Sequence, residues 1–239
     1  MKPVLIIGTG HAPDTIRARH GDFPQWFQRA ARLMCWRVRV IDVAAGDELP
    51  PVTGVAGAII TGSAAMVTER LPWSEQTAGW IRDAMDVDLP LFGVCFGHQL
   101  MAHALGGRVD YLPGGREIGT QSITLSPDAA DDVATGATSA TFRAHTTHEQ
   151  SVLEAPPGAV VLARSARDPH QMLRYGRNAV STQFHPEFSA EVMRAYVRRK
   201  HAETRHADLR RLGVFREVAA TPGARRLLRQ FARRHGWAE

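Results

Sequence analysis

The chain has 239 residues, 44% of them hydrophobic and 22% charged, so it can bury one large core, and no apolar stretch approaches the roughly 20 residues of a membrane span. Residues 1–3 run directly into a strand without a signal-peptide core, and Cys35 and Cys95 are too few for a disulfide framework, so we expect a soluble, cytoplasmic protein. The formal net charge is +5, but the basic residues are almost all arginine and spread along the chain, so we expect neither a nucleic-acid nor a membrane partner.

The first half of the chain alternates between predicted strands and helices. The apolar run 4–8 ends at a glycine and suits a central strand that is buried on both faces. Further strands are predicted at 37–43, 57–63 and 89–94, with helices at 23–34 and 73–85. This order predicts an α/β fold with a doubly wound, mostly parallel sheet, whose active site lies beyond the carboxyl ends of the strands.

The first strand is followed by Gly8-Thr9-Gly10, which begins like a dinucleotide-binding fingerprint. Pro13 occupies the position where a third small residue should open the helix. We therefore expect no nicotinamide cofactor.

Cys95 lies between Gly93 and Gly97, directly after an apolar strand and directly before a helical pattern. This order predicts a nucleophile elbow, in which flanking glycines let the strand and the helix pack closely around a strained residue. The dipole of the following helix favours the thiolate over the thiol. A cysteine that merely packs as a small hydrophobic residue would explain neither glycine.

The second half changes to short strands, predicted at 118–125, 160–164, 171–175 and 179–184, which we expect to be antiparallel in part. Helices are predicted to begin at Ser189 and at Thr221, and the second carries an apolar stripe of Leu227, Leu228 and Phe231. We expect a catalytic domain at 1–190 and a helical extension at 191–239 that packs on it.

His185 ends the last predicted strand and is followed by Pro186 and Glu187. A cysteine nucleophile needs a base, and the base needs a third group that orients its ring. Because proline cannot extend a strand, the chain turns there, and Glu187 can fold back to accept the other ring N–H. The sequence therefore predicts a pair of His185 and Glu187 that serves Cys95.

These motifs, 93–99 and 184–187, resemble the class I, or triad, glutamine amidotransferases. Thr61-Gly62-Ser63 is similar to the oxyanion-loop glycine motif of this family, and Glu117-Ile118-Gly119 is found before a strand in these domains. Two segments depart from the family pattern: Ala64-Ala65 replaces the usual proline, and Thr147-His148-Glu149 matches a substrate-lining loop only loosely.

The resemblance implies a flavodoxin-like fold and hydrolysis of the γ-carboxamide of glutamine through a cysteine thioester. It implies that Cys95, His185 and Glu187 form the catalytic triad. It also implies that backbone N–H groups near Gly62 and at Phe96 form the oxyanion hole and that Gln99 contacts the bound substrate.

No metal and no cofactor are expected. His145 and His148 would be spaced for a metal only on a helix, and the surrounding threonines are typical of a loop or strand. His98 and His103 follow the elbow and are expected to pack or to hydrogen-bond near the site.

Three functions stay open at this point. The chain lacks a nucleotide-binding signature, so an amidotransferase would pass ammonia to a synthetase partner, as the similar glutaminase portion of GMP synthase does. Alternatively, it is a freestanding hydrolase of γ-glutamyl peptides, similar to the γ-glutamyl peptidases of the same superfamily. The third function is a binding protein with a decayed site, which the intact triad motifs argue against.

Overall fold

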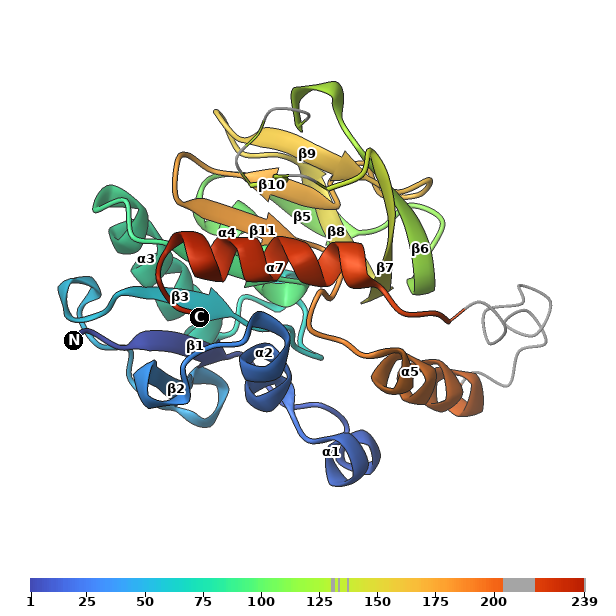
Figure 1. The fold of residues 1–239 in the computed structure, drawn as a ribbon, viewed down its shortest axis with the longest axis horizontal. Coiled ribbons are helices and arrows are strands. Elements are labelled where there is room, and N and C mark those ends of the chain that lie inside the picture. Colours follow the sequence, from blue (N-terminus) through green and yellow to red (C-terminus); the bar gives the residue numbers. More distant parts are fainter. Residues whose placement is uncertain (130–131, 133, 137, 204–217, 239) are drawn as a thin grey trace.

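The computed structural model describes residues 1–129, 132, 134–136, 138–203 and 218–238, and its centre is a nine-stranded mixed sheet (Figure 1). Five neighbouring strands are parallel, in the spatial order β2 (Val38–Asp42), β1 (Val4–Gly8), β3 (Gly57–Ile60), β4 (Leu91–Val94) and β11 (Ala179–Thr182). Antiparallel strands continue the sheet beyond β11, namely β10 (Met172–Arg174), β9 (Val160–Arg164), β6 (Glu117–Leu125) and β7 (Thr141–His148). A separate antiparallel pair consists of β5 (Arg108–Tyr111) and β8 (Gln150–Glu154).

Helices cover both faces of the sheet (Figure 1). They are α1 (Asp14–His20), α2 (Phe23–Ala31), α3 (Pro72–Asp86), α4 (Phe96–Ala104), α5 (Ala190–Glu203) and α7 (Pro222–Arg234). Short 3₁₀ turns lie at Cys35–Arg37, Val43–Ala45, Val52–Gly54, Val67–Glu69 and Pro127–Ala129. The α/β fold with flanking helices that the sequence predicts is confirmed.

Strand β1 shows why the sheet is covered on both sides. Val4 and Ile6 belong to the apolar core under α2 and α7, whereas Leu5 and Ile7 belong to the core under α3 and α4. All four side chains are buried, as expected for a central strand whose successive residues point to opposite faces. Because β1, β3 and β4 are parallel to one another, their carboxyl ends lie at the same edge of the sheet.

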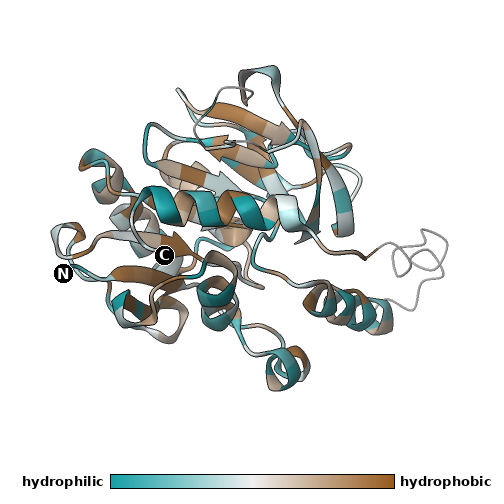
Figure 2. Ribbon diagram, viewed as in Figure 1, coloured by the Kyte–Doolittle hydropathy of each residue, from teal (hydrophilic) through white to brown (hydrophobic). Residues whose placement is uncertain are grey.

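Helix α7 lies across one face of the sheet, with its hydrophilic side turned outward (Figures 1 and 2). Its stripe of Leu227, Leu228 and Phe231 is buried. The Phe231 ring packs edge-on against Phe92 of β4, with 5.1 Å between the two ring centroids, and against Trp237, with 5.3 Å between the centroids. Residues 204–217 and 239 of the arginine-rich tail lie outside the described residues. The domain boundary near residue 190 stays a prediction.

Several elements differ from the sequence predictions. The helix predicted at 23–34 ends at Ala31, because Arg32 takes a left-handed conformation with φ 56°. Strands β5, β7 and β8 and helix α1 were not predicted, since their sequences show neither a clean alternation nor a helical apolar stripe. Within the described part of the chain, none of the helices combines the length and apolar character that crossing a lipid bilayer requires.

Candidate active site

Cys95 lies at the turn between β4 and α4 in a strained backbone conformation, with φ 53° and ψ −103°. Its N–H donates to the carbonyl oxygen of Thr182 at 2.9 Å, which fixes the turn to the neighbouring strand β11. A Cβ added at Gly93 would lie 2.7 Å from the carbonyl oxygen of Gly97, and one added at Gly97 would lie 2.4 Å from that of Ile60. Both glycines are therefore needed for the close approach, and a strained residue at this point is typical of a functional site.

His185 and Glu187 form a buried pair just after β11. The Nδ1 of His185 donates to Oε1 of Glu187 at 2.7 Å, and the His185 backbone N–H donates to the carbonyl oxygen of His145 at 2.8 Å. The ring of Phe188 stacks on the imidazole with a centroid distance of 4.0 Å and an interplanar angle of 18°. The imidazole is thus held by one hydrogen bond and one aromatic face, and the backbone of His185 is held by a second hydrogen bond.

The charge state of His185 is set by competing effects. Burial disfavours the imidazolium, but the Glu187 carboxylate and the Cys95 sulfur favour it more strongly and raise the pKa of His185 to about 10. Within the described residues, the far ring nitrogen Nε2 makes no hydrogen bond to a nitrogen or oxygen atom, and the Cys95 sulfur is the group that favours a proton on this side of the ring. This arrangement supports an imidazolium whose Nε2–H serves Cys95 and the cavity.

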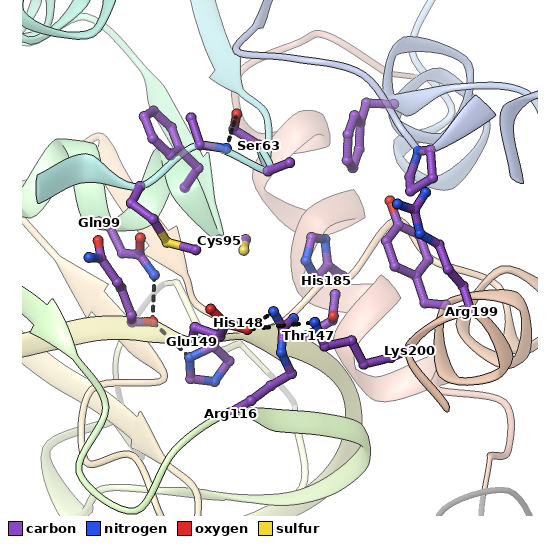
Figure 3. A pocket seen from close by; sticks show the side chains of 18 of the residues that line it. Ser63, Cys95, Gln99, Arg116, Thr147, His148, Glu149, His185, Arg199 and Lys200 are labelled. Carbon is purple, nitrogen blue, oxygen red and sulfur yellow. Dashed lines mark hydrogen bonds and ion pairs between the residues drawn. The ribbon is translucent and has the colours of Figure 1, made fainter. Parts of the chain in front are cut away.

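Cys95 and His185 both face one cavity of about 190 Å³ (Figure 3). Gly62 lies beside both of them, because a Cβ added there would be 3.1 Å from Cε1 of His185 and 3.5 Å from Cβ of Cys95. Phe96, the first residue of α4, also lines the cavity. A sulfur and an imidazole thus face one cavity at the start of a helix, which is an arrangement suited to acyl transfer. An oxyanion hole formed by the Gly62 and Phe96 N–H groups stays a prediction.

Gln99, one turn after Cys95, lies at the wall of the same cavity. Its Nε2 donates to the carbonyl oxygen of Gln150 at 2.7 Å and to Oε1 of Gln183 at 2.9 Å. Both amide hydrogens are therefore used inside the protein. Only Oε1 of Gln99 is left for a ligand, and it can only accept a hydrogen bond.

A buried network supports the turn between β7 and β8. Nε2 of His148 lies 3.0 Å from Oε2 of Glu117, and Nδ1 of His148 lies 2.9 Å from the carbonyl oxygen of Gln150. Burial would raise the pKa of Glu117, but hydrogen bonds from His148 and Ser165 hold it below its usual value, so the carboxylate is ionised. Both ring nitrogens of His148 thus lie within hydrogen-bond distance of an acceptor, and the ring is fixed between the Glu117 carboxylate and the Gln150 carbonyl.

Helix α5 contributes a wall of the cavity that the sequence interpretation missed. Tyr196, Arg199, Lys200 and Glu203 line the cavity, and they share one helix face because Arg199, Lys200 and Glu203 follow Tyr196 by three, four and seven positions. Lys200 approaches Glu149 of the β7–β8 turn at 3.8 Å. This helical spacing of polar residues is the signal in the sequence that could predict the wall.

Arg116 is a further missed residue, because it precedes β6 in a loop with no recognisable motif. It pairs with Glu149, and Figure 3 shows both side chains beside His148 at the rim of the cavity. Thr147, His148 and Glu149 all line the cavity, although their sequence matches the family loop only loosely.

His11 lines the cavity and lies between Asp22 and Asp42, whereas His98 and His103 do not line it. His98 contacts Oγ of Ser181 at 2.7 Å, and burial lowers its pKa to about 3. His103 contacts Glu75 at 3.0 Å near the surface. Among the described residues, no group of three or more potential metal ligands is found.

Comparison with known proteins shows which sequences and structures the chain resembles. The sequence profile of the family "glutamine amidotransferase class-I" matches residues 25–203. The chain is 30% identical over 139 residues to γ-glutamyl peptidase 4 of Arabidopsis thaliana, covering 57% of this chain and 55% of that protein. It is 35% identical over 131 residues to a GMP synthase of Thermomicrobium roseum, covering 55% of this chain and 23% of that enzyme.

The fold agrees with solved structures. A glutamine amidotransferase from Thermotoga maritima superposes with a TM-score of 0.77 at 21% identity, covering 98% of this chain and 97% of that one. The chain spans about half the length of the γ-glutamyl peptidase and about a quarter of the GMP synthase. Because the family profile matches three quarters of the residues of the chain, the chain belongs to the class-I glutamine amidotransferase family.

Proposed function

We propose that the protein hydrolyses the γ-carboxamide of glutamine through a thioester on Cys95, with His185 and Glu187 completing a catalytic triad. The observation that carries this proposal is the strained Cys95 beside an imidazole whose pKa is raised to about 10 by Glu187 and the Cys95 sulfur despite its burial. A buried structural histidine without a charged partner would instead lose its proton.

The first half of the proposed reaction forms the thioester. The Cys95 thiolate attacks the γ-carbonyl carbon, and the oxyanion is received by the N–H groups of Gly62 and Phe96. His185 then gives its Nε2 proton to the departing nitrogen, so that ammonia leaves rather than an amide anion. Glu187 keeps Nδ1 protonated and stabilises the imidazolium without carrying a proton itself.

The second half releases glutamate. Neutral His185 takes a proton from a water molecule, the resulting hydroxide attacks the thioester carbonyl, and the same two N–H groups receive the second oxyanion. The proton taken from water restores the imidazolium, and collapse of the intermediate breaks the C–S bond, expels the Cys95 thiolate and releases glutamate. Gln99, which offers only an acceptor oxygen, is suited to the α-ammonium group of the substrate.

Two uses of this chemistry fit different relatives. The similarity to GMP synthases supports transfer of the ammonia to an acceptor on a synthetase partner. The similarity to γ-glutamyl peptidases 4 and 5 supports a freestanding γ-glutamyl peptide hydrolase, in which the leaving group is an amino acid amine. Both uses need the same thioester and differ only in the leaving group and its fate.

Substrate assays and thiol labelling together test the proposal. Release of ammonia from glutamine and of free amino acid from γ-glutamyl dipeptides is measured for the wild type, Cys95→Ala and Cys35→Ala. Cys35 is exposed and outside the cavity, so Cys35→Ala serves as the matched control and is expected to keep full activity. Cys95→Ala is expected to lose both activities.

A glutamine-like chloromethyl ketone is expected to label Cys95 and spare Cys35, although Cys35 is the more exposed thiol. Equal labelling of both thiols, or activity retained in Cys95→Ala, would refute the role of Cys95. A higher kcat/KM on γ-glutamyl dipeptides than on glutamine would select the freestanding hydrolase.

A further inference from the structure

Thr9 is the buried centre of the Gly8-Thr9-Gly10 segment, which resembles a dinucleotide fingerprint without completing one. It is fully buried, does not line the cavity, and packs against the loop that carries Gly62. The close packing needs Gly10, because a Cβ there would lie 3.0 Å from Oγ of Ser63. The segment after β1 is therefore fitted to the loop after β3.

The contacts of Thr9 with this loop are unusually dense. Its hydroxyl lies within donating distance of two consecutive carbonyl oxygens, those of Thr61 at 3.1 Å and Gly62 at 3.0 Å. Its backbone N–H donates to Oγ1 of Thr61 at 3.1 Å. The Thr61 carbonyl also accepts the N–H of Gly97, at the start of α4, at 3.0 Å.

These contacts fix the direction of two peptide planes. The described chain contains no cis peptide bond, so the N–H of Gly62 points opposite to the Thr61 carbonyl, and the N–H of Ser63 points opposite to the Gly62 carbonyl. Both carbonyls are turned toward buried Thr9. Both N–H groups are consequently turned away from Thr9. Ser63, which carries one of them, lines the cavity, and Gly62 lies beside Cys95 and His185.

We propose that Thr9 is a positioning residue for the oxyanion hole: its hydroxyl holds the 61–63 loop with the Gly62 N–H aimed at the oxyanion that forms beside Cys95. This inference rests on the proposed function, because it presupposes a tetrahedral intermediate at Cys95. The Gly8-Thr9-Gly10 segment does not complete a dinucleotide-binding motif, and this role explains the presence of Thr9 in it.

The fold itself has other supports for this loop. In Thr9→Val, which replaces the hydroxyl by a methyl group of similar size, the Thr61 carbonyl keeps the Gly97 N–H and the Gly62 carbonyl keeps Oγ1 of Thr61 at 3.2 Å. The variant is therefore expected to fold. The loop loses the Thr9 hydroxyl, which contacts the carbonyl groups of both Thr61 and Gly62.

The test compares two reactions of the same thiol. Hydrolysis of glutamine or of a γ-glutamyl dipeptide forms an oxyanion, whereas alkylation of Cys95 by iodoacetamide forms none. In Thr9→Val, kcat is expected to fall about 10- to 100-fold with KM within twofold of the wild type, below the roughly 10²–10³-fold loss for removing an oxyanion donor outright. The rate constant for alkylation is expected to stay within twofold.

Two variants act as controls. Thr9→Ser keeps the hydroxyl and is expected to restore most of the kcat, whereas Thr77→Val makes the same chemical change in helix α3, where the hydroxyl donates to the Trp73 carbonyl at 2.7 Å. Thr77→Val is expected to leave kcat unchanged. If Thr9→Val does not fold, Thr9→Ala also removes the hydroxyl and adds no methyl group, although it deletes the γ-methyl of threonine as well.

The outcomes separate the inference from the proposed function. An unchanged kcat in Thr9→Val, or a parallel loss of hydrolysis and alkylation, would overturn the role of Thr9 and leave the thioester mechanism standing. Hydrolysis that persists in Cys95→Ala would overturn the proposed function and the inference with it.

Discussion

Replacing Gly97 by alanine tests how the elbow and the oxyanion loop depend on each other. The added Cβ would lie 2.4 Å from the carbonyl oxygen of Ile60 and 2.9 Å from its carbonyl carbon and Cβ. Ordinary contacts between nonbonded heavy atoms lie at about 3.5–4.0 Å, so helix α4 and the end of β3 must separate by about 1 Å. These atoms are the Ile60 carbonyl group and the Cβ attached directly to its backbone, so they cannot rotate aside as the far end of a flexible side chain can.

This separation has two measurable consequences. Forced overpacking of this kind costs typically about 1–3 kcal/mol of the free energy of unfolding. The same movement shifts Gly62, two residues after Ile60, relative to Cys95, and a displacement of about 1 Å at a reacting centre can cost on the order of 100-fold in rate. We therefore expect Gly97→Ala to lose both stability and kcat.

Gly79→Ala is the matched control, because Gly79 lies within helix α3 and the nearest atom to an added Cβ is a guanidinium nitrogen of Arg82 at 3.7 Å. Alanine in a helix interior is favoured over glycine by about 0.5–1 kcal/mol, so this variant should be slightly more stable and fully active. Urea denaturation and initial rates of ammonia release measure both effects. Wild-type stability and kcat in Gly97→Ala would refute the reasoning.

Other variants probe the charges and the packing. Glu187→Gln removes a negative charge that helps to raise the pKa of His185 to about 10, so the imidazolium should lose its proton at a lower pH. The alkaline limb of the plot of kcat against pH should therefore move to lower pH. An unmoved limb would contradict the pairing of His185 with Glu187. Glu187→Gln should also retain more activity than His185→Ala, and the reverse ranking would argue against the orienting role. Leu228→Ala, at a fully buried site in α7, should cost about 2–5 kcal/mol by denaturation while the folded fraction keeps its kcat. A binding assay with DNA and RNA at increasing salt concentration should detect no tight complex. Tight binding of nucleic acid whose affinity falls by orders of magnitude between about 50 and 200 mM salt would show that the arginine-rich tail binds phosphates.

The parts of the site that sequence alone could predict are those whose geometry is local. Gly93, Cys95 and Gly97 lie within five residues, and the steric need for each glycine follows from the strand-to-helix turn itself. His185 and Glu187 are two residues apart, so the turn at Pro186 suffices to bring their side chains together. Geometry of this short-range kind can be predicted from the spacing of the residues in the sequence.

The parts that sequence could not predict depend on how distant segments meet. The wall formed by α5 faces the cavity only because β11 delivers that helix beside the β7–β8 turn, where Lys200 approaches Glu149. Likewise, His148 is held between Glu117 and the Gln150 carbonyl, and the spacing of these residues in the sequence does not predict that Glu117 lies there. Strand β7, rich in threonine and histidine, gave no period-two signal because both of its faces carry polar residues.

The most direct test of the central claim is detection of the thioester itself. The wild-type chain is mixed with saturating glutamine, quenched in acid during turnover, digested and analysed by mass spectrometry. The account predicts a glutamyl adduct on the peptide that contains Cys95, absent from the peptide that contains Cys35 and sensitive to hydroxylamine. Ammonia release at the wild-type rate from Cys95→Ala, or a trapped adduct on any other residue, would contradict it.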